Sequence, residues 1–157
     1  QVFLMFYLVD TTPQNGCLRV IPGSHLKRHP LHDLISPRHT EETKTYSNPD
    51  NPAFSQVDDE VDVPLKAGDL VMGYGGLLHA SHANQSDERR TVLTMWYYPD
   101  YVDLPERTQA TVHRAEKNNC EANPPSEKVH TLLEPLKIVY TGKAEPIEQQ
   151  LVPVGLK

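Results

Sequence analysis

The stretch QVFLMFYLVDTTPQNGCLRVI, residues 1–21, contains the pattern that decides the fold. Residues 2–9 are apolar almost throughout and rich in aromatic and branched side chains, which predicts a central β-strand covered on both faces. TTPQNG (11–16) has the composition of a turn, and the alternating CLRVI (17–21) follows it. We therefore expect residues 17–21 to return beside the first strand as a hairpin that ends at Pro22-Gly23.

Further short strands separated by turns extend as far as Pro99. VDVPLKAGDLVMGYGGLLHASH (61–82) contains strand-like segments, and RRTVLTMWYYP (89–99) is the last of them. Short strands at fairly even spacing favour an antiparallel sandwich or barrel. Residues 24–60 are polar and contain four prolines. Because polar stretches of that length are usually functional, we expect a substrate lid there, with one helical turn in HPLHDLI (29–35).

The sequence changes character after Pro99. LPERTQATVHRAEKN (104–118) has the composition of an exposed helix. SEKVHTLLEPL (126–136) begins with a capping-box pattern at Ser126, which predicts a second helix. We therefore expect a single domain over residues 1–157, with core strands in 1–99 and a helical and extended segment in 100–157.

Composition and charge exclude several classes of protein. Hydrophobic residues make up 38% of the 157 residues and charged residues 23%, which is typical of one globular domain. The formal net charge of −6 argues against nucleic acid or an anionic membrane as a partner. The longest apolar run, residues 2–9, is far shorter than the roughly 20 residues of a membrane span.

Two further features concern the setting of the protein. Two cysteines are too few for a disulfide framework, so a reducing, cytoplasmic location is the default expectation. The chain opens on an apolar strand without an initiator methionine. An unflanked apolar strand needs neighbours, so we expect residues before Gln1 in the intact protein, where any targeting signal would lie.

The segment LLHASHANQSDERR (77–90) contains the candidate functional residues. On a strand, His79 and Ser81 share one face, while Ala80 and His82 share the other. If residues 83–88 connect to an antiparallel strand, the same parity makes Arg90 and Arg89 alternatives for the inward face. A metal at His79 and a carboxylate on the guanidinium of Arg90 would offset the cost of burying these groups. A hydrogen-bonded core histidine and a solvated arginine pair remain the ordinary alternative.

NGCLRVIPGSH (15–25) and GDLVMGYGGLLHASHANQSDERR (68–90), followed by an apolar strand, resemble the phytanoyl-CoA dioxygenase family of iron(II)/2-oxoglutarate oxygenases. The resemblance covers roughly residues 1–98. It implies a mainly β fold, a double-stranded β-helix (jelly roll, cupin-like) that is partial here, with helices following it. It also implies Fe(2+) and 2-oxoglutarate as cofactor and co-substrate, and hydroxylation of an unactivated C–H bond in a small organic substrate.

By the same resemblance, individual positions acquire expected roles. His79 matches the distal histidine ligand of iron and is the expected catalytic metal ligand. Ser81 and Arg90 match residues that hold the far carboxylate of 2-oxoglutarate. Phe6 falls where the family often has an aromatic residue beside the co-substrate.

One part of the family pattern is missing from this sequence. The family's facial triad takes its first histidine and its carboxylate from an H-x-D motif upstream of the first strand here, and the chain contains no H-x-D. His39-Thr40-Glu41 is the one H-x-[DE], but it lies on the wrong side of PGSH. His82 has the opposite parity to His79. The alternatives are therefore a non-catalytic cupin-like binding or scaffolding domain, or an enzyme with another oxidation outcome, such as a halogenase.

Overall fold

The computed structural model describes residues 1–34 and 48–147, which form two compact units that divide between Pro99 and Asp100. The first unit contains all the described strands, and the second contains the two longer helices. The elements of the first unit are β1 (Val2–Tyr7), β2 (Leu18–Val20), α1 (Leu31–Leu34), η1 (Pro52–Phe54), β3 (Val61–Val63), β4 (Leu70–Tyr74), β5 (His79–Ser81) and β6 (Val92–Tyr97).

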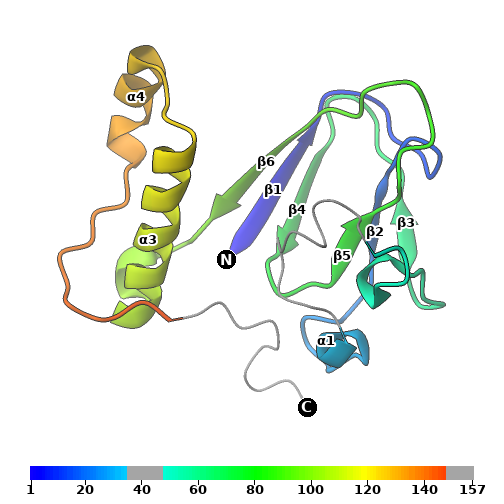
Figure 1. Ribbon diagram of the computed structural model, residues 1–157, viewed down its shortest axis with the longest axis horizontal. Coiled ribbons are helices and arrows are strands. Elements are labelled where there is room, and N and C mark those ends of the chain that lie inside the picture. Colours follow the sequence, from blue (N-terminus) through cyan, green and yellow to red (C-terminus); the bar gives the residue numbers. More distant parts are fainter. Residues whose placement is uncertain (35–47, 148–157) are drawn as a thin grey trace. The chain divides into compact units, whose positions relative to one another are not determined.

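Two three-stranded antiparallel sheets make up the first unit. In sheet A the strand order is β4-β1-β6, and in sheet B it is β3-β2-β5 (Figure 1). β1 is therefore a central strand, as its apolar sequence predicts. Phe3 of β1 pairs with Gly73 of β4 on one side and with Trp96 of β6 on the other.

The predicted hairpin between residues 2–9 and 17–21 is wrong, because β1 and β2 belong to different sheets. The turn between them is stabilised by Asn15, whose side-chain oxygen accepts from the Thr12 backbone N–H at 2.7 Å and whose amide donates to the Asp10 carbonyl at 2.9 Å. Gly16 adopts a φ of 94°, a conformation that favours glycine. The segment therefore carries the chain from one sheet to the other instead of folding it back.

The connections after β3 repeat this crossing. β3 lies in sheet B, β4 in sheet A, β5 in sheet B and β6 in sheet A. Residues 83–91 accordingly connect two sheets and are not a hairpin loop. Two antiparallel sheets with alternating connections confirm the mainly β class, and a closed double-stranded β-helix stays a prediction.

Only one face of sheet A is buried among the described residues. Phe3 and Tyr7, on one face of β1, are each 1% exposed. The other face carries apolar side chains at every position, and Met72 on it is 69% exposed. That outer face of sheet A consists of Val2, Leu4, Phe6, Leu70, Met72, Tyr74, Leu93, Met95 and Tyr97. Val2, Leu4 and Phe6 of β1 on that face are half-buried, so the expectation that β1 is covered on both faces stays a prediction.

Two contacts fix the long segment between β2 and β3. Arg19 of β2 is 5% exposed, and its guanidinium donates to Glu60 at 2.9 Å and to the Ser55 carbonyl at 3.2 Å. The PGSH turn is bonded to the residue before β5, because the Ser24 hydroxyl accepts from the Leu78 backbone N–H at 2.8 Å. α1 lies within the predicted helical turn, whereas His39-Thr40-Glu41 lies outside the described residues.

The second unit contains η2 (Tyr101–Asp103), α3 (Glu106–Ala122), α4 (Glu127–Leu133) and η3 (Glu134–Leu136). Both predicted helices are present, and the Ser126 hydroxyl caps α4 by accepting from the Val129 backbone N–H at 3.4 Å. α3 buries Ala110 and Val112. Among the described residues, none of these helices combines the length and the apolar character required to cross a membrane.

Candidate functional site

His79 is the first residue of β5, and its ring lies against sheet A. The centroids of the His79 and Phe3 rings are 4.6 Å apart, with 33° between the ring planes. His79 Nδ1 lies 2.8 Å from the Leu77 carbonyl oxygen, a distance at which the protonated nitrogen donates to that carbonyl. In that tautomer Nε2 carries the lone pair, which is the arrangement of a histidine metal ligand with its second nitrogen held by a hydrogen bond.

The position of the Phe3 ring depends on a glycine in the neighbouring strand. A Cβ on Gly73 would lie 2.0 Å from Phe3 Cζ, so only glycine leaves room for the ring. Trp96 contacts the same ring edge-on, with centroids 5.9 Å apart. Gly73 and Trp96 thus adjoin the Phe3 ring, against which the imidazole of His79 packs.

Strand alternation separates the two histidines of the HASH segment. His79 pairs with Val20 and Ser81 pairs with the buried Leu18, so both belong to the face of sheet B that meets Phe3. Ser81 itself is exposed. His82 belongs to the opposite face, where its Nε2 lies 2.6 Å from Asp62 Oδ1.

Arg90 lies two residues before β6, beside Gly16 of the turn that leads into β2. A Cβ on Gly16 would lie 3.3 Å from Arg90 Nε, so the Arg90 side chain passes directly over the Gly16 backbone. Burial raises the pKa of the Tyr7 hydroxyl, and the positive charge of Arg90 acts against that rise. Arg90 is half-buried while Arg89 is exposed. Among the described residues, no carboxylate forms an ion pair with Arg90.

Phe3 lies beside His79, and Tyr7 lies close enough to Arg90 to be affected by its charge. Both project from the same face of β1, four residues apart, which corresponds to about 13 Å along a strand. Met5 occupies the intervening position on that face, and the Tyr7 hydroxyl lies 3.8 Å from its sulfur. The interior of the first unit therefore has an imidazole at one end and a guanidinium with a phenol at the other.

The structure does not bring Phe6 to this group. Phe6 alternates with Phe3 and Tyr7 on β1 and belongs to the outer face of sheet A, with Leu70 and Leu93 as its cross-strand partners. The aromatic residues beside His79 and Arg90 are instead Phe3 and Tyr7. The alternation of side chains along residues 2–9 places Phe6 on the opposite face from Phe3 and Tyr7, but the alternation alone does not determine which face points inward.

The donor atoms around His79 fit an iron centre only in part. A non-haem iron(II) oxygenase site takes two histidines and one carboxylate. Within residues 1–34 and 48–147, His79 belongs to no group of three histidine, cysteine or carboxylate ligand atoms close enough to share a metal ion. The described residues thus provide no complete set of three iron ligands around His79, and Arg90 supplies a guanidinium suited to a carboxylate.

Comparison with known proteins identifies the chain's relatives. Residues 1–92 match the family model described as phytanoyl-CoA dioxygenase (PhyH). Phytanoyl-CoA dioxygenase 1 of Oryza sativa subsp. japonica is 36% identical over 95 residues, which are 59% of this chain and 31% of the relative. Phytanoyl-CoA dioxygenase domain-containing protein 1 of Mus musculus is 30% identical over 92 residues, covering 59% of this chain and 31% of the relative. The chain thus spans about a third of the length of these relatives.

Two solved structures from Streptomyces have some similarity to this chain. HygX from Streptomyces hygroscopicus, crystallised with nickel and 2-oxoglutarate, is 23% identical with a TM-score of 0.45, and the match covers 59% of this chain and 33% of HygX. AviO1 from Streptomyces viridochromogenes is 31% identical with a TM-score of 0.39, over 63% of this chain and 37% of AviO1.

Proposed function

Because this chain belongs to the phytanoyl-CoA dioxygenase (PhyH) family, we propose that it forms the 2-oxoglutarate-binding part of an iron(II)/2-oxoglutarate-dependent dioxygenase acting on a small organic substrate. In this proposal His79 is the distal iron ligand, through Nε2. Arg90 holds the far carboxylate of 2-oxoglutarate, with Ser81 on the same face of sheet B. A double-stranded β-helix belongs to the same proposal, whereas the substrate lid expected over residues 24–60 lies partly outside the described residues.

The observation that carries the proposal is the environment of Arg90. A half-buried guanidinium without a carboxylate partner in the described residues keeps an uncompensated charge away from water, which is costly. An anionic ligand offsets that cost, and the planar guanidinium accepts a carboxylate through two parallel hydrogen bonds. 2-Oxoglutarate has one carboxylate for such a contact and a keto-acid end that chelates a metal.

Tyr7 is the residue that sequence reasoning missed here. Its hydroxyl is buried, and the electrostatic effect of Arg90 reaches it. We assign Tyr7 a second hydrogen bond to the same carboxylate. To Phe3, which contacts His79, we assign the role expected for Phe6, that of an aromatic side chain packed beside the metal and co-substrate.

A binding domain without catalysis is the second candidate. It is favoured by the donor set, since within residues 1–34 and 48–147 His79 belongs to no group of three ligand atoms close enough to share a metal ion. We therefore derive no reaction step through iron from this chain. A dioxygenase requires the two missing ligands elsewhere in the complete gene product, whereas a binding domain requires only the carboxylate site.

The first experiment measures 2-oxoglutarate binding to the chain by calorimetry. Arg90→Ala should weaken binding at least about thirtyfold, since losing one partner of a buried charge pair costs about 2 kcal/mol or more. Arg89→Ala is the matched control, because Arg89 is the adjacent arginine and is exposed. Equal effects of the two substitutions would overturn the assignment of the carboxylate site.

The second experiment separates the enzyme from the binding domain. In the complete gene product supplied with iron(II), release of succinate from 2-oxoglutarate should depend on His79, and His79→Ala should abolish it. His82→Ala should leave most of it, because His82 lies on the other face of sheet B. If no succinate forms while 2-oxoglutarate still binds through Arg90, the non-catalytic candidate is correct.

A further inference from the structure

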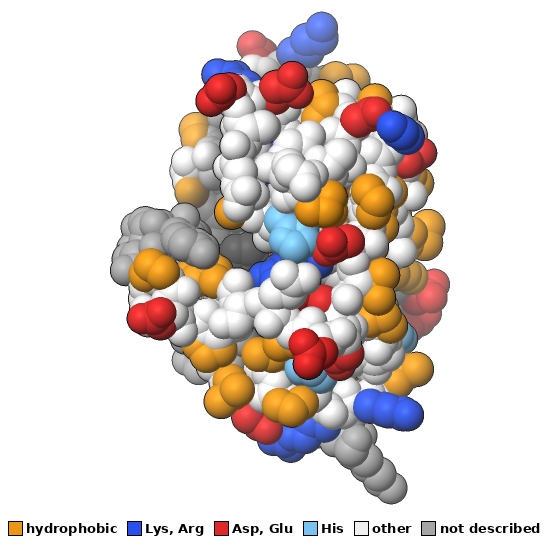
Figure 2. Space-filling view, turned by 90° about the vertical axis from the view of Figure 1, so that its right-hand side faces the viewer, with side chains coloured by type: hydrophobic (Ala, Val, Ile, Leu, Met, Phe, Trp, Pro, Cys, Tyr) orange, Lys and Arg blue, Asp and Glu red, His pale blue; other side chains and the backbone are white. Residues whose placement is uncertain are grey.

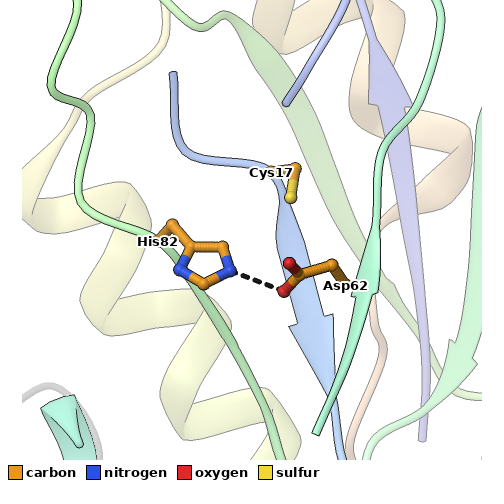
Figure 3. A group of neighbouring side chains, drawn as sticks. All are labelled: Cys17, Asp62 and His82. Carbon is orange, nitrogen blue, oxygen red and sulfur yellow. Dashed lines mark hydrogen bonds and ion pairs between the residues drawn. The ribbon is translucent and has the colours of Figure 1, made fainter. Parts of the chain in front are cut away.

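The face of sheet B that points away from His79 carries a cluster of three different metal-binding side chains. Cys17 lies directly before β2, Asp62 lies in β3 and His82 directly follows β5, so three adjacent segments contribute one residue each. Figure 3 shows the Cys17 sulfur and the Asp62 carboxylate facing the His82 ring. The nearest ligand atoms of the three residues all lie within 4.8 Å of one another.

We propose that Cys17, Asp62 and His82 bind a zinc ion at a site that does not include His79 and that adjoins Arg90. The proposal does not rest on the proposed dioxygenase function. Thiolate, imidazole and carboxylate are the three side-chain ligands that zinc takes in proteins. A thiolate and a carboxylate together carry two negative charges, which one Zn²⁺ neutralises. A soft thiolate among the ligands favours zinc over magnesium or calcium.

The geometry requires only a small adjustment to close around a metal. Zinc lies about 2.3 Å from sulfur and about 2.0–2.2 Å from nitrogen or oxygen, so two ligand atoms of one tetrahedral ion are separated by roughly 3.5 Å. The widest separation in the cluster, at most 4.8 Å, therefore has to shorten by at most about 1.3 Å. His82 Nε2 and Asp62 Oδ1, now 2.6 Å apart, have to separate slightly to admit the ion.

The backbone positions of the cluster are already held in place. The Cys17 backbone N–H donates to the Thr12 carbonyl at 2.8 Å, and the Cys17 carbonyl accepts from the His82 backbone N–H at 3.1 Å. Asp62 pairs across the strands with Arg19, whose guanidinium is bonded to Glu60. Ligands that project from paired strands lose little conformational freedom when a metal binds, and this raises affinity.

An entry path exists from the solvent side. Cys17 is fully buried, whereas the side chains of His82 and Asp62 are 18% and 37% exposed. Histidine side chains with acidic side chains beside them are visible at the surface in Figure 2. A metal ion can therefore approach through the imidazole and carboxylate and reach the sulfur last, leaving a fourth coordination position for water. The buried sulfur is shielded from larger molecules, which disfavours a role as a nucleophile toward an organic substrate.

Binding changes the protonation of the thiol. Burial raises the pKa of the Cys17 thiol and the Asp62 carboxylate raises it further, against a smaller lowering by the Arg90 guanidinium, so the metal-free sulfur carries its proton at neutral pH. Coordination converts the thiol to a thiolate and releases that proton to the solvent. The metal–sulfur bond then provides a spectroscopic signal that neither an imidazole nor a carboxylate gives.

Cobalt(II) replaces zinc in the test, because a thiolate bound to cobalt has a charge-transfer absorption in the near ultraviolet. Titration of the full 157-residue chain under reducing conditions should produce this absorption, saturating at a single cobalt per chain, and added zinc should remove it. Cys17→Ser should abolish the absorption. Cys120→Ser is the matched control and should leave it unchanged, since Cys120 is the other cysteine of the chain and is exposed.

Two further variants keep the test decisive if Cys17→Ser does not fold. Asp62→Asn and His82→Gln alter partly exposed side chains and should each weaken cobalt binding at least about tenfold while circular dichroism shows a folded chain. His79→Ala should leave the absorption in place, which separates this site from the proposed iron site. The proposal is overturned if the chain shows no thiolate absorption with cobalt, if Cys120→Ser removes it, or if neither Asp62→Asn nor His82→Gln weakens it.

Discussion

Replacing Gly73 by alanine should destabilise the first unit through the Phe3 ring on which His79 rests. A Cβ at position 73 would lie 2.0 Å from Phe3 Cζ and 2.5 Å and 2.6 Å from its two Cε atoms. Carbon atoms in contact are separated by about 3.5 Å, so the ring has to retreat by about 1.5 Å. The ring is 1% exposed and is enclosed by His79 and Trp96, so no free space receives it.

The magnitude follows from two opposed effects. Overpacking a filled core costs about 1–3 kcal/mol. Removing a glycine from the interior of a strand stabilises by roughly 0.5–1 kcal/mol, because the unfolded chain loses conformational freedom. The net loss in the free energy of unfolding is about 1–2 kcal/mol. For a unit of this size, that lowers the melting temperature by about 5–15 °C.

Thermal unfolding followed by circular dichroism measures this loss. Met72→Ala is the matched control in the same strand, because Met72 is 69% exposed and its truncation should change stability by less than about 0.5 kcal/mol. In the double variant Gly73→Ala/Phe3→Leu, the smaller side chain relieves the clash, so the two effects should be non-additive by at least about 0.5 kcal/mol. A clash between the Cβ at position 73 and the Phe3 ring is ruled out if Gly73→Ala has the same melting temperature as the unsubstituted chain. It is also ruled out if the loss of stability in the double variant equals the sum of the losses in Gly73→Ala and Phe3→Leu.

Three other substitutions test separate parts of the structure. Tyr7→Phe should weaken 2-oxoglutarate binding by about three- to tenfold, the loss of one hydrogen bond, as measured by calorimetry. Arg19→Met should destabilise the chain by about 3–5 kcal/mol in urea unfolding, since it leaves the buried carboxylate of Glu60 unpaired. Asp10→Asn should reduce the dependence of the free energy of unfolding on pH at acidic pH. Lys66 lowers the pKa of Asp10 in the folded chain, so this carboxylate stabilises the fold above the unfolded pKa of about 3.9. The stabilisation is lost as the pH falls through the lower pKa of the folded chain.

Each of the three substitutions has a matched control. Tyr74→Phe removes a hydroxyl from the exposed outer face of sheet A and should leave 2-oxoglutarate affinity unchanged. Arg28→Ala breaks the exposed ion pair with Asp33 and should cost less than about 1 kcal/mol. Asp103→Asn replaces a carboxylate of the second unit, so the pH dependence of the stability of the first unit should be the same as in the unsubstituted chain. An Arg19→Met variant as stable as Arg28→Ala would contradict the assignment of a buried, paired charge.

The sequence predicts most of the strands and helices correctly but not which strands pair with one another. The apolar run of residues 2–9 correctly predicts a central strand, and the Ser126 capping pattern correctly predicts the start of α4. Both are local features, because strand propensity and helix capping depend on a few neighbouring residues. Which strands pair with one another does not depend on the neighbouring residues in the sequence. A turn such as residues 11–16 can return a strand to its neighbour or carry it to another sheet, and packing decides between these outcomes.

The sequence by itself determined the family, the element types and the alternation that groups His79 with Ser81 and separates both from His82. These follow from motif order and from the two-residue period of a strand. Tertiary structure alone decided which face of each strand points inward. It placed Phe3 and Tyr7, rather than Phe6, beside His79 and Arg90, and it assembled Cys17, Asp62 and His82 from three separate segments. The physical reason is that alternation fixes which side chains share a face, whereas contacts between sheets determine which face is buried.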